Sequence, residues 1–279
     1  MAASEDGGSS SMAAEIRVSR KPTIIGKLIA HPLARGVDLD DPRATVLRRQ
    51  ILADKKFLRK IYEEWYAAVV ADLPSTDGPV LELGSGAGFL KEALPEVITS
   101  DIMQLPGLSL VLDATSIPLR SKVLRSIVMI DVLHHIPQPR RFFKEATHCV
   151  KPGGRIIMIE PWMTPWSKFV YTRLHDEPCL PDASEWEFPS TGPLSGANEA
   201  LPWILFDRDH SRFRSEFPLW KIVYIRPDMP FSYLLSGGVS LRIGLPGSTF
   251  AAVRWFEKSL GSWARKMAMF AKIVLERLP

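Results

Sequence analysis

The segment VLELGSGAGFL, residues 80–90, constrains the fold more than any other part of the chain. A short apolar run carries an acidic residue near its end, and the glycines Gly84, Gly86 and Gly88 follow it. Glycine lets the backbone turn sharply and approach a ligand without an obstructing Cβ. The segment therefore predicts a buried parallel strand, a tight turn and a helix, with a nucleotide-type ligand at the turn.

The acidic residue in this segment, Glu82, indicates which ligand. A dinucleotide fingerprint needs room and backbone N–H donors for a pyrophosphate at the helix N-terminus. Glu82 places a negative charge there, which disfavours phosphate and favours a cationic amino-acid group. S-adenosylmethionine carries such a group together with a sulfonium.

Two further strands are predicted to end in carboxylates. Residues 95–102 read as a second short strand ending at Asp101, where a carboxylate suits both hydroxyls of a ribose. Residues 108–119 predict a third strand that ends at Asp113 and leads into a loop able to hold an adenine.

A fourth strand over residues 125–137 brings three polar side chains to the same edge of the sheet: Asp131, His134 and His135. A helix-like segment, QPRRFFKEATHCV, comes next. Residues 151–161 then predict a turn at Pro152, Gly153 and Gly154, followed by a fifth strand.

The order of these motifs resembles that of the class I S-adenosylmethionine-dependent methyltransferases, specifically the methyltransferase type 11 group. The resemblance covers roughly residues 78–162. It implies an α/β fold, a doubly wound seven-stranded mostly parallel sheet of order 3-2-1-4-5-7-6, with an N-terminal helical cap and lid insertions. It also implies methyl transfer from S-adenosylmethionine to a small-molecule, glycan or lipid-linked acceptor, at oxygen. The cofactor-binding residues that it implies are Glu82, Gly84, Ser85, Gly86, Asp101, Ile102, Asp113, Ala114 and Asp131.

A hydroxyl acceptor must lose its proton, so a general base is useful. His175 lies beside Asp176 and Glu177, either of which could orient its ring, and is one candidate. His134 is the other. Packing and hydrogen bonding are the alternative for His134, and a solvated surface loop is the alternative for His175.

No metal site is expected from the spacing of the ligand-type residues. Cys149 and Cys179 have neither metal spacing nor a framework of neighbouring cysteines, so we expect free thiols in a reducing cytoplasm. No run approaches about 18 apolar residues, so no transmembrane helix is predicted. The N-terminus lacks the basic-then-apolar order of a secretory signal.

We expect a flexible tail over residues 1–15, a helical cap over 16–77 and a methyltransferase domain over 78–279. An amphipathic helix is predicted from about 42 to 72 within the cap. Short helices and ordered loops are expected in a lid at 162–218, and helices in a second insertion at 231–266. The sixth and seventh strands are predicted at 219–227 and 269–279.

The formal net charge of +4 raises the question of an anionic partner. Basic residues concentrate in the cap, where they form either a solvated helix face or a surface for lipid or another anion. Nucleic acid is not expected, because DVLHH stands where methylases of exocyclic amines carry an Asn/Asp-Pro-Pro-aromatic run. Residues 231–266 mix apolar and basic side chains, which suits either a lid packed over the site or peripheral membrane contact.

Two other functions remain open at this stage. A nicotinamide-dependent oxidoreductase is disfavoured by the glycine pattern behind Glu82 and by the lack of a Tyr-x-x-x-Lys pair. A non-catalytic S-adenosylmethionine-binding protein would keep the same motifs. The sequence leaves the methyl acceptor, its acceptor atom and the oligomeric state undetermined.

Overall fold

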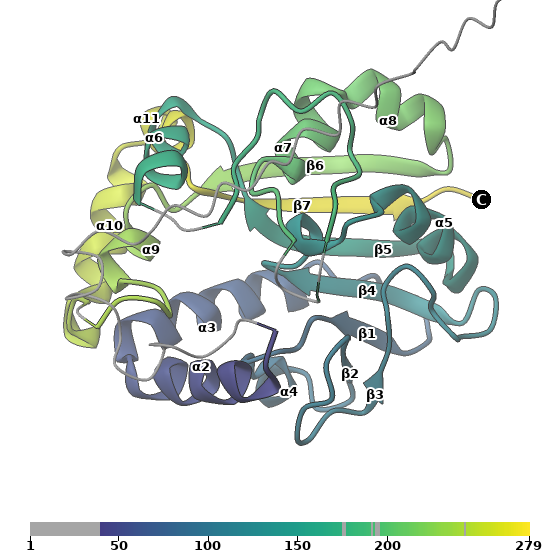
Figure 1. Cartoon of the computed structure of the whole chain (residues 1–279), viewed down its shortest axis with the longest axis horizontal. Coiled ribbons are helices and arrows are strands. Elements are labelled where there is room, and N and C mark those ends of the chain that lie inside the picture. Colours follow the sequence, from purple (N-terminus) through teal and green to yellow (C-terminus); the bar gives the residue numbers. More distant parts are fainter. Residues whose placement is uncertain (1–39, 175–176, 191, 193–195, 243) are drawn as a thin grey trace, which may run out of the picture.

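The computed structural model describes residues 40–174, 177–190, 192, 196–242 and 244–279. The expected tail at 1–15 and the first part of the expected cap lie outside the described residues. A seven-stranded sheet of order β3-β2-β1-β4-β5-β7-β6 forms the centre of the molecule (Figure 1). The predicted fold class and strand order are therefore confirmed.

The first five strands of this sheet run parallel, and β7 is antiparallel to both of its neighbours. Leu81 pairs with Ile98 on one side and with Ile127 on the other, so β1 lies between β2 and β4. The strands are β1 Val80–Leu83, β2 Ile98–Asp101, β3 Leu110–Val111, β4 Leu124–Ile130, β5 Val150–Pro161, β6 Trp220–Asp228 and β7 Phe270–Arg277.

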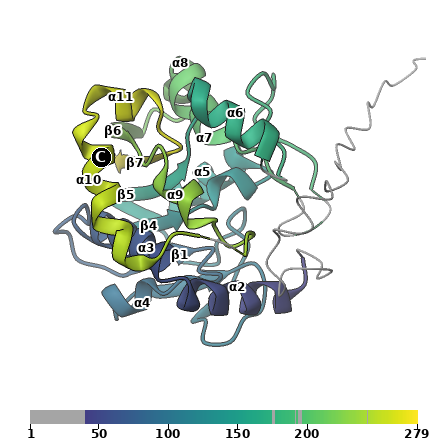
Figure 2. The ribbon, with the colours of Figure 1, turned by 90° about the vertical axis from the view of Figure 1, so that its left-hand side faces the viewer.

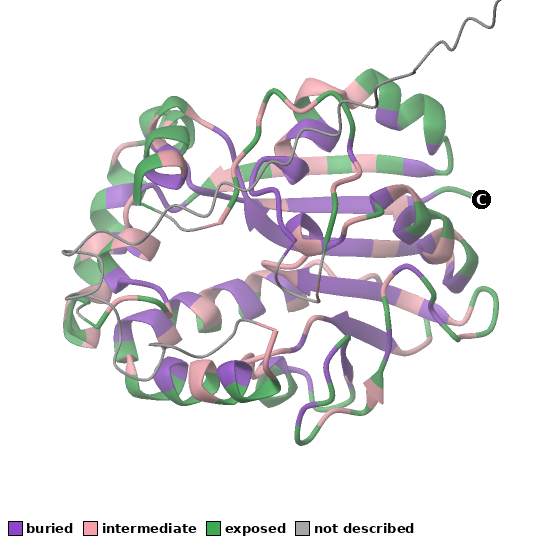
Figure 3. Ribbon diagram, viewed as in Figure 1, coloured by how far each residue is buried: buried purple, intermediate pink, exposed green. Residues whose placement is uncertain are grey.

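The core follows the central strands, which are almost wholly buried (Figure 3). Every residue of β1 is buried, as expected for a strand with parallel neighbours on both sides. Helix α5, Pro139–Cys149, contributes two fully buried aromatic side chains, Phe142 and Phe143. This burial explains why the central strands are apolar runs without alternation.

Three details of the predicted strands are wrong. The fourth strand, predicted over residues 125–137, ends at Ile130, and Leu133–His135 form a 3-10 helix. The third strand is only two residues long, because the chain turns at Asp113, which forms a single bridge with Ser116. The glycine-rich turn before the fifth strand lies inside β5 as a bulge, where the register shifts between Leu124 and Ser126. Gly153 accommodates the bulge with a positive φ of 76°.

The single helix predicted for residues 42–72 is two helices, α2 Pro42–Asp54 and α3 Lys56–Val70. They separate at Lys55, whose ψ is 85°. The ammonium group of Lys55 donates to the carbonyl oxygens of Gly238 (2.6 Å) and Leu241 (3.2 Å), and its burial lowers its pKa to about 8. The break thus depends on contacts with a segment far away in the sequence.

Short helices joined by loops form both insertions, as predicted (Figure 2). The first contains α6 Pro165–Leu174, α7 Leu201–Trp203, the π-helical turn η3 Ile204–Arg208 and α8 His210–Glu216. The second contains α9 Ser232–Ser236, η4 Gly247–Thr249, α10 Phe250–Ser259 and α11 Ser262–Lys266. Among the described residues, no helix has the length and apolar character needed to cross a bilayer.

Aromatic contacts join the cap to the second insertion. The Trp65 ring of α3 stacks on Tyr233 of α9, with centroids 5.9 Å apart, and lies 5.0 Å from the ring of Phe270 in β7. These contacts bring α3, α9 and the start of β7 together beside the carboxyl ends of the parallel strands (Figures 1 and 2).

Candidate active site

A cavity of about 750 Å³ lies where the parallel strands end. Its walls come from the strand ends, from α2 and α3 of the cap, and from both insertions. All nine residues that the sequence assigned to the cofactor line it: Glu82, Gly84, Ser85, Gly86, Asp101, Ile102, Asp113, Ala114 and Asp131. The topology thus brings the predicted carboxylates to one edge of the sheet, as expected for a doubly wound fold.

The turn after β1 requires its glycines. Gly84 has a φ of 64°, and a Cβ added there would lie only 2.5 Å from Cγ2 of Val132. Gly86 has a φ of 40°, and its N–H donates to Oδ2 of Asp101 over 3.0 Å. The turn therefore leaves bare backbone at the cavity, where a ligand can approach closely.

Glu82 lies at the floor of this turn and is only 5% exposed. Ser85 donates its hydroxyl to Oε2 of Glu82 over 2.6 Å and accepts the N–H of Ser100 over 3.1 Å. Burial raises the pKa of Glu82 to about 7, and the hydrogen bond from Ser85 opposes this shift only in part. A cationic group entering the cavity would favour the ionised form.

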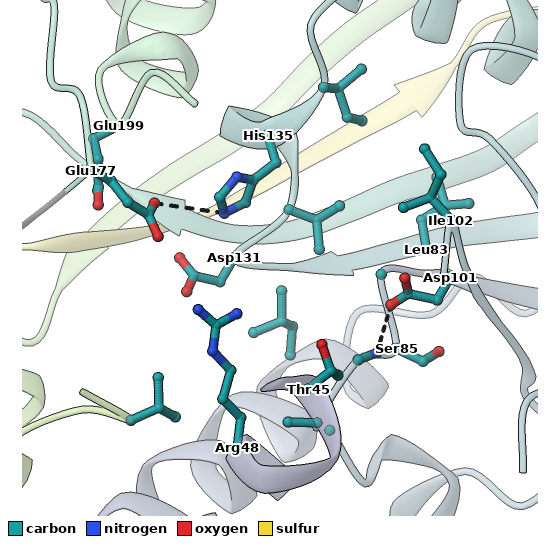
Figure 4. Close-up of a pocket in the computed structure, with 18 of the residues that line it drawn as sticks. Thr45, Arg48, Leu83, Ser85, Asp101, Ile102, Asp131, His135, Glu177 and Glu199 are labelled. Atoms are coloured by element: carbon teal, nitrogen blue, oxygen red, sulfur yellow. Dashed lines mark hydrogen bonds and ion pairs between the residues drawn. The ribbon is translucent and has the colours of Figure 1, made fainter. Parts of the chain in front are cut away.

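Asp101 ends β2 with both carboxylate oxygens in use. Oδ1 accepts the N–H of Met103 over 2.9 Å, and Oδ2 accepts the N–H of Gly86. Burial raises the pKa of Asp101, while these backbone donors oppose the rise. Each oxygen keeps a further lone pair, so the carboxylate fits the two hydroxyls of a ribose (Figure 4).

Asp113 accepts the N–H of Thr115 over 2.7 Å. This hydrogen bond caps the turn at Asp113, which is a role besides the predicted adenine site. Ala114 lines the cavity beside it. The two roles are compatible, because the capped turn holds the loop in place.

Asp131 follows β4 with a φ of 62°, an unfavourable conformation for a residue other than glycine. Burial raises its pKa to about 7, although the nearby His134 opposes the shift. In Figure 4 the guanidinium of Arg48, on α2, lies just below Asp131. Arg48 of the cap and Asp131 at the end of β4 both line the cavity.

The histidine pair forms the short 3-10 helix η2, Leu133–His135, and its two rings take different places. His135 lines the cavity beside Glu177, and burial lowers its pKa. His134 lies behind that wall at 1% exposure. Burial lowers the pKa of His134, but the carboxylates of Glu160 and Glu177 outweigh this effect and raise it well above its usual value. His175 lies outside the described residues.

Sequence reasoning missed several residues of the cavity wall, namely Thr45, Arg48, Tyr62, Tyr66, Tyr171, Glu177, Glu199 and Tyr233. Glu177 was considered only as a neighbour of His175, and Arg48 only as part of a basic helix face. Glu160, behind the wall, could have been found, because it is a carboxylate at the carboxyl end of a predicted parallel strand.

A comparison with protein families decides the class of this site. The family described as "Methyltransferase domain", of the type 11 group, matches residues 81–158. The chain contains a class I methyltransferase domain. It is an S-adenosylmethionine-dependent methyltransferase, and S-adenosylmethionine is its cofactor, in place of the nicotinamide alternative.

No curated protein matches the chain in sequence. One similar solved structure is geranyl diphosphate C-methyltransferase from Streptomyces coelicolor A3(2), in complex with Mg²⁺, geranyl diphosphate and S-adenosylhomocysteine. It is 11% identical to this chain, with a TM-score of 0.46, and the match covers 90% of this chain and 89% of that chain. The putative methyltransferase of Haloferax volcanii in complex with the Trm112 activator is 15% identical, with 83% and 98% covered and a TM-score of 0.46. A putative methyltransferase from Bacillus halodurans C-125 is 14% identical, with 77% and 98% covered and a TM-score of 0.43.

Proposed function

We propose that this methyltransferase transfers the methyl group to an oxygen of a small-molecule, glycan or lipid-linked acceptor. One observation carries the proposal. His135 and Glu177 lie 3.6 Å apart in the wall of the same cavity that Glu82 and Asp101 line (Figure 4). A hydroxyl acceptor needs such polar groups where its proton leaves.

The residues after β1 and β2 fit the cofactor. S-adenosylmethionine supplies an electrophilic methyl group on a sulfonium. We assign Glu82 to the cationic amino-acid end and Asp101 to the ribose hydroxyls, because each carboxylate borders the bare turn at Gly86. The loop at Asp113 and Ala114 would hold the adenine.

The remaining wall is assigned to the acceptor. It combines phenol rings, carboxylates and apolar side chains, namely Tyr171, Glu177, Glu199, Tyr233, Val170, Leu174 and Leu234. We propose that the two insertions, 162–218 and 231–266, are the lid over this part of the cavity and that residues 16–77 are the cap. Orientation of the acceptor and exclusion of water are the main tasks of such a wall.

The outer surface of the second insertion favours a lipid-linked acceptor. Three aromatic side chains of α10 and α11 are exposed, namely Trp255, Phe256 and Trp263, with exposed fractions of 73%, 49% and 64%. Lys258, Arg265 and Lys266 are exposed on the same two helices. Apolar rings beside basic groups suit a bilayer with anionic headgroups.

Acidic side chains of α10 and α11 do not oppose this surface, although Lys258 lies 3.5 Å from Glu64 of the cap. Glu257 is the acidic residue within residues 247–268, and it is fully buried in an ion pair with Arg254. Phe169 and Leu174 of α6 are also exposed, and Leu174 lines the cavity as well. We propose that a lipid-linked acceptor enters the cavity beside Leu174.

The experiment is to incubate the protein with methyl-labelled S-adenosylmethionine and, separately, with the organic-soluble and water-soluble fractions of a cell extract. We expect label on an oxygen of an organic-soluble product. His135→Ala should lower turnover by about 100-fold or more. Its affinity for S-adenosylhomocysteine should be unchanged.

Label on nitrogen or carbon would contradict the proposed acceptor atom. Wild-type turnover by His135→Ala would show that this wall is not the acceptor site. A product found only in the water-soluble fraction would contradict the lipid-linked class while leaving methyl transfer to oxygen intact.

A further inference from the structure

Three potential metal ligands face one another at the acceptor end of the cavity. Nε2 of His134 lies 3.5 Å from Oε2 of Glu177, and Nε2 of His135 lies 3.6 Å from the same oxygen. Ligand atoms from the three side chains all lie within 4.8 Å of one another. These separations are long for hydrogen bonds. They suit ligands on one shared ion, because bonds of about 2.0 to 2.2 Å in a tetrahedral arrangement place ligand atoms roughly 3.4 Å apart.

The other nitrogen of each ring already has a partner. Nδ1 of His135 lies 3.3 Å from the carbonyl oxygen of Gly196, which can only accept, so this nitrogen carries the hydrogen. Nδ1 of His134 lies 3.0 Å from Oε2 of Glu160. The second oxygen of Glu160 accepts the backbone N–H groups of Val132 (2.9 Å) and Leu133 (2.8 Å), which fixes the carboxylate. Metal-binding histidines are typically held in this way, by a carboxylate or a carbonyl at the far nitrogen.

A metal ion between the rings and Glu177 would take the place of the proton that His134 otherwise holds beside these carboxylates. A neutral imidazole has one N–H, so each ring that donates from Nδ1 turns the lone pair of Nε2 toward a carboxylate oxygen. The two rings are also close to each other, with centroids 4.2 Å apart. A bound cation would balance the charge of the carboxylate and use the ring lone pairs that this geometry brings together.

We propose that His134, His135 and Glu177 bind a divalent transition metal ion. Two imidazole nitrogens and one carboxylate oxygen are a donor set for Zn²⁺, Fe²⁺ or Co²⁺, whereas Mg²⁺ and Ca²⁺ prefer oxygen ligands alone. His135 and Glu177 line the cavity, so a coordination position remains open toward it. This proposal departs from the expectation from the sequence that the chain has no metal site.

The role of the ion, unlike its binding, rests on the proposed function. An ion in the acceptor wall would hold and polarise the acceptor's oxygen. The metal would then position the hydroxyl, and the cofactor side of the cavity would remain as described.

The test is a titration of the full chain, stripped with a chelator, with Zn²⁺ by calorimetry and with Co²⁺ by visible absorption. We expect one ion per chain, with Mg²⁺ not binding at the same concentration. Glu177→Gln and His135→Ala should weaken binding by about 100-fold or more. His210→Ala, on α8 and away from the cavity lining, is the matched control and should bind as wild type.

Glu160→Gln provides a second, independent variant with all three ligands intact. The amide would offer an N–H to Nδ1 of His134 and so favour the tautomer with hydrogen on Nε2, which cannot bind a metal. We expect binding about 10- to 100-fold weaker. Thermal unfolding of each variant checks that it folds.

Wild-type protein that binds neither Zn²⁺ nor Co²⁺ would overturn the site. So would folded Glu177→Gln and Glu160→Gln variants that bind as tightly as wild type. S-adenosylhomocysteine is titrated into the same stripped samples. If S-adenosylhomocysteine binds but no metal ion does, only the metal site is contradicted. If a metal ion binds but S-adenosylhomocysteine does not, only the proposed function is contradicted.

Discussion

Glu82 combines burial, a raised pKa and a single side-chain donor, and these give it a measurable effect on stability. Below about pH 4.5 its carboxyl is protonated in the folded and the unfolded chain, and above about pH 7 it is ionised in both. Between these values the folded chain binds the proton that the unfolded chain has lost. Its contribution to stability is therefore lost as the pH rises through about 7.

We predict that the free energy of unfolding of ligand-free wild type falls relative to Glu82→Gln by roughly 1 to 3 kcal/mol between pH 4.5 and pH 8. Glutamine keeps an oxygen for the Ser85 hydroxyl but cannot ionise. Urea unfolding at several pH values measures the difference. If the free energies of unfolding of the two proteins changed with pH in parallel, burial would not raise the pKa of Glu82.

Single site residues were best predicted from the sequence where neighbouring residues determine their position. Glu82, Gly86 and Asp101 could be assigned because the glycine turn and the parallel strand ends determine where they lie. Of the two adjacent histidines, the sequence prediction named His134 as a candidate base, whereas His135 lines the cavity. The sequence predicts one continuous strand over residues 125–137. It therefore does not reveal that the chain leaves β4 at Asp131, with positive φ, and enters a 3-10 turn. That turn buries His134 and places His135 in the cavity wall.

Helix α10 is joined to the cap and to β6 through one buried side chain. Arg254 is 3% exposed, and its guanidinium lies 2.8 Å from Oε1 of Glu64 and 2.7 Å from Oδ2 of Asp228. It also pairs with the fully buried Glu257, which accepts the N–H of Ser232 over 2.7 Å. This network sets the position of the helix that carries the exposed Trp255 and Phe256.

Removal of Arg254 should leave Glu257 as an uncompensated buried charge. We predict that Arg254→Met lowers the free energy of unfolding by about 3 to 5 kcal/mol, measured by urea denaturation. Lys258→Met is the control, because Lys258 is exposed and its 3.5 Å pair with Glu64 should contribute about 1 kcal/mol or less. Equal losses in the two variants would mean that α10 does not depend on the buried network.

The helices and strands were largely predictable from the sequence, but their junctions were not. The break at Lys55 depends on carbonyl oxygens of residues 238 and 241, and no pattern within residues 42–72 contains them. Likewise, Arg48 and Tyr66 enter the cavity wall because α2 and α3 pack at the strand ends. Such contacts between distant segments carry no local signal.

On the scale of the whole molecule, the exposed aromatic and basic side chains of α10 and α11 predict peripheral binding to membranes. Flotation with vesicles containing an anionic phospholipid at low salt should carry the protein upward. Trp255→Ser with Trp263→Ser should abolish this, and neutral vesicles or high salt should weaken it. Protein that stays at the bottom with anionic vesicles at low salt would contradict the membrane surface and favour a water-soluble acceptor.

The central claim is that the cavity at the strand ends binds the S-adenosyl group through Asp101. Calorimetric titration of S-adenosylhomocysteine and, separately, NADH into wild type and Asp101→Ala tests it most directly, with Asp54→Ala on the outer end of α2 as a control. We predict that S-adenosylhomocysteine binds wild type and the control equally, that Asp101→Ala binds it about 1 to 3 kcal/mol more weakly, and that NADH does not bind. Binding of NADH alone, or unchanged affinity in a folded Asp101→Ala variant, would contradict the claim.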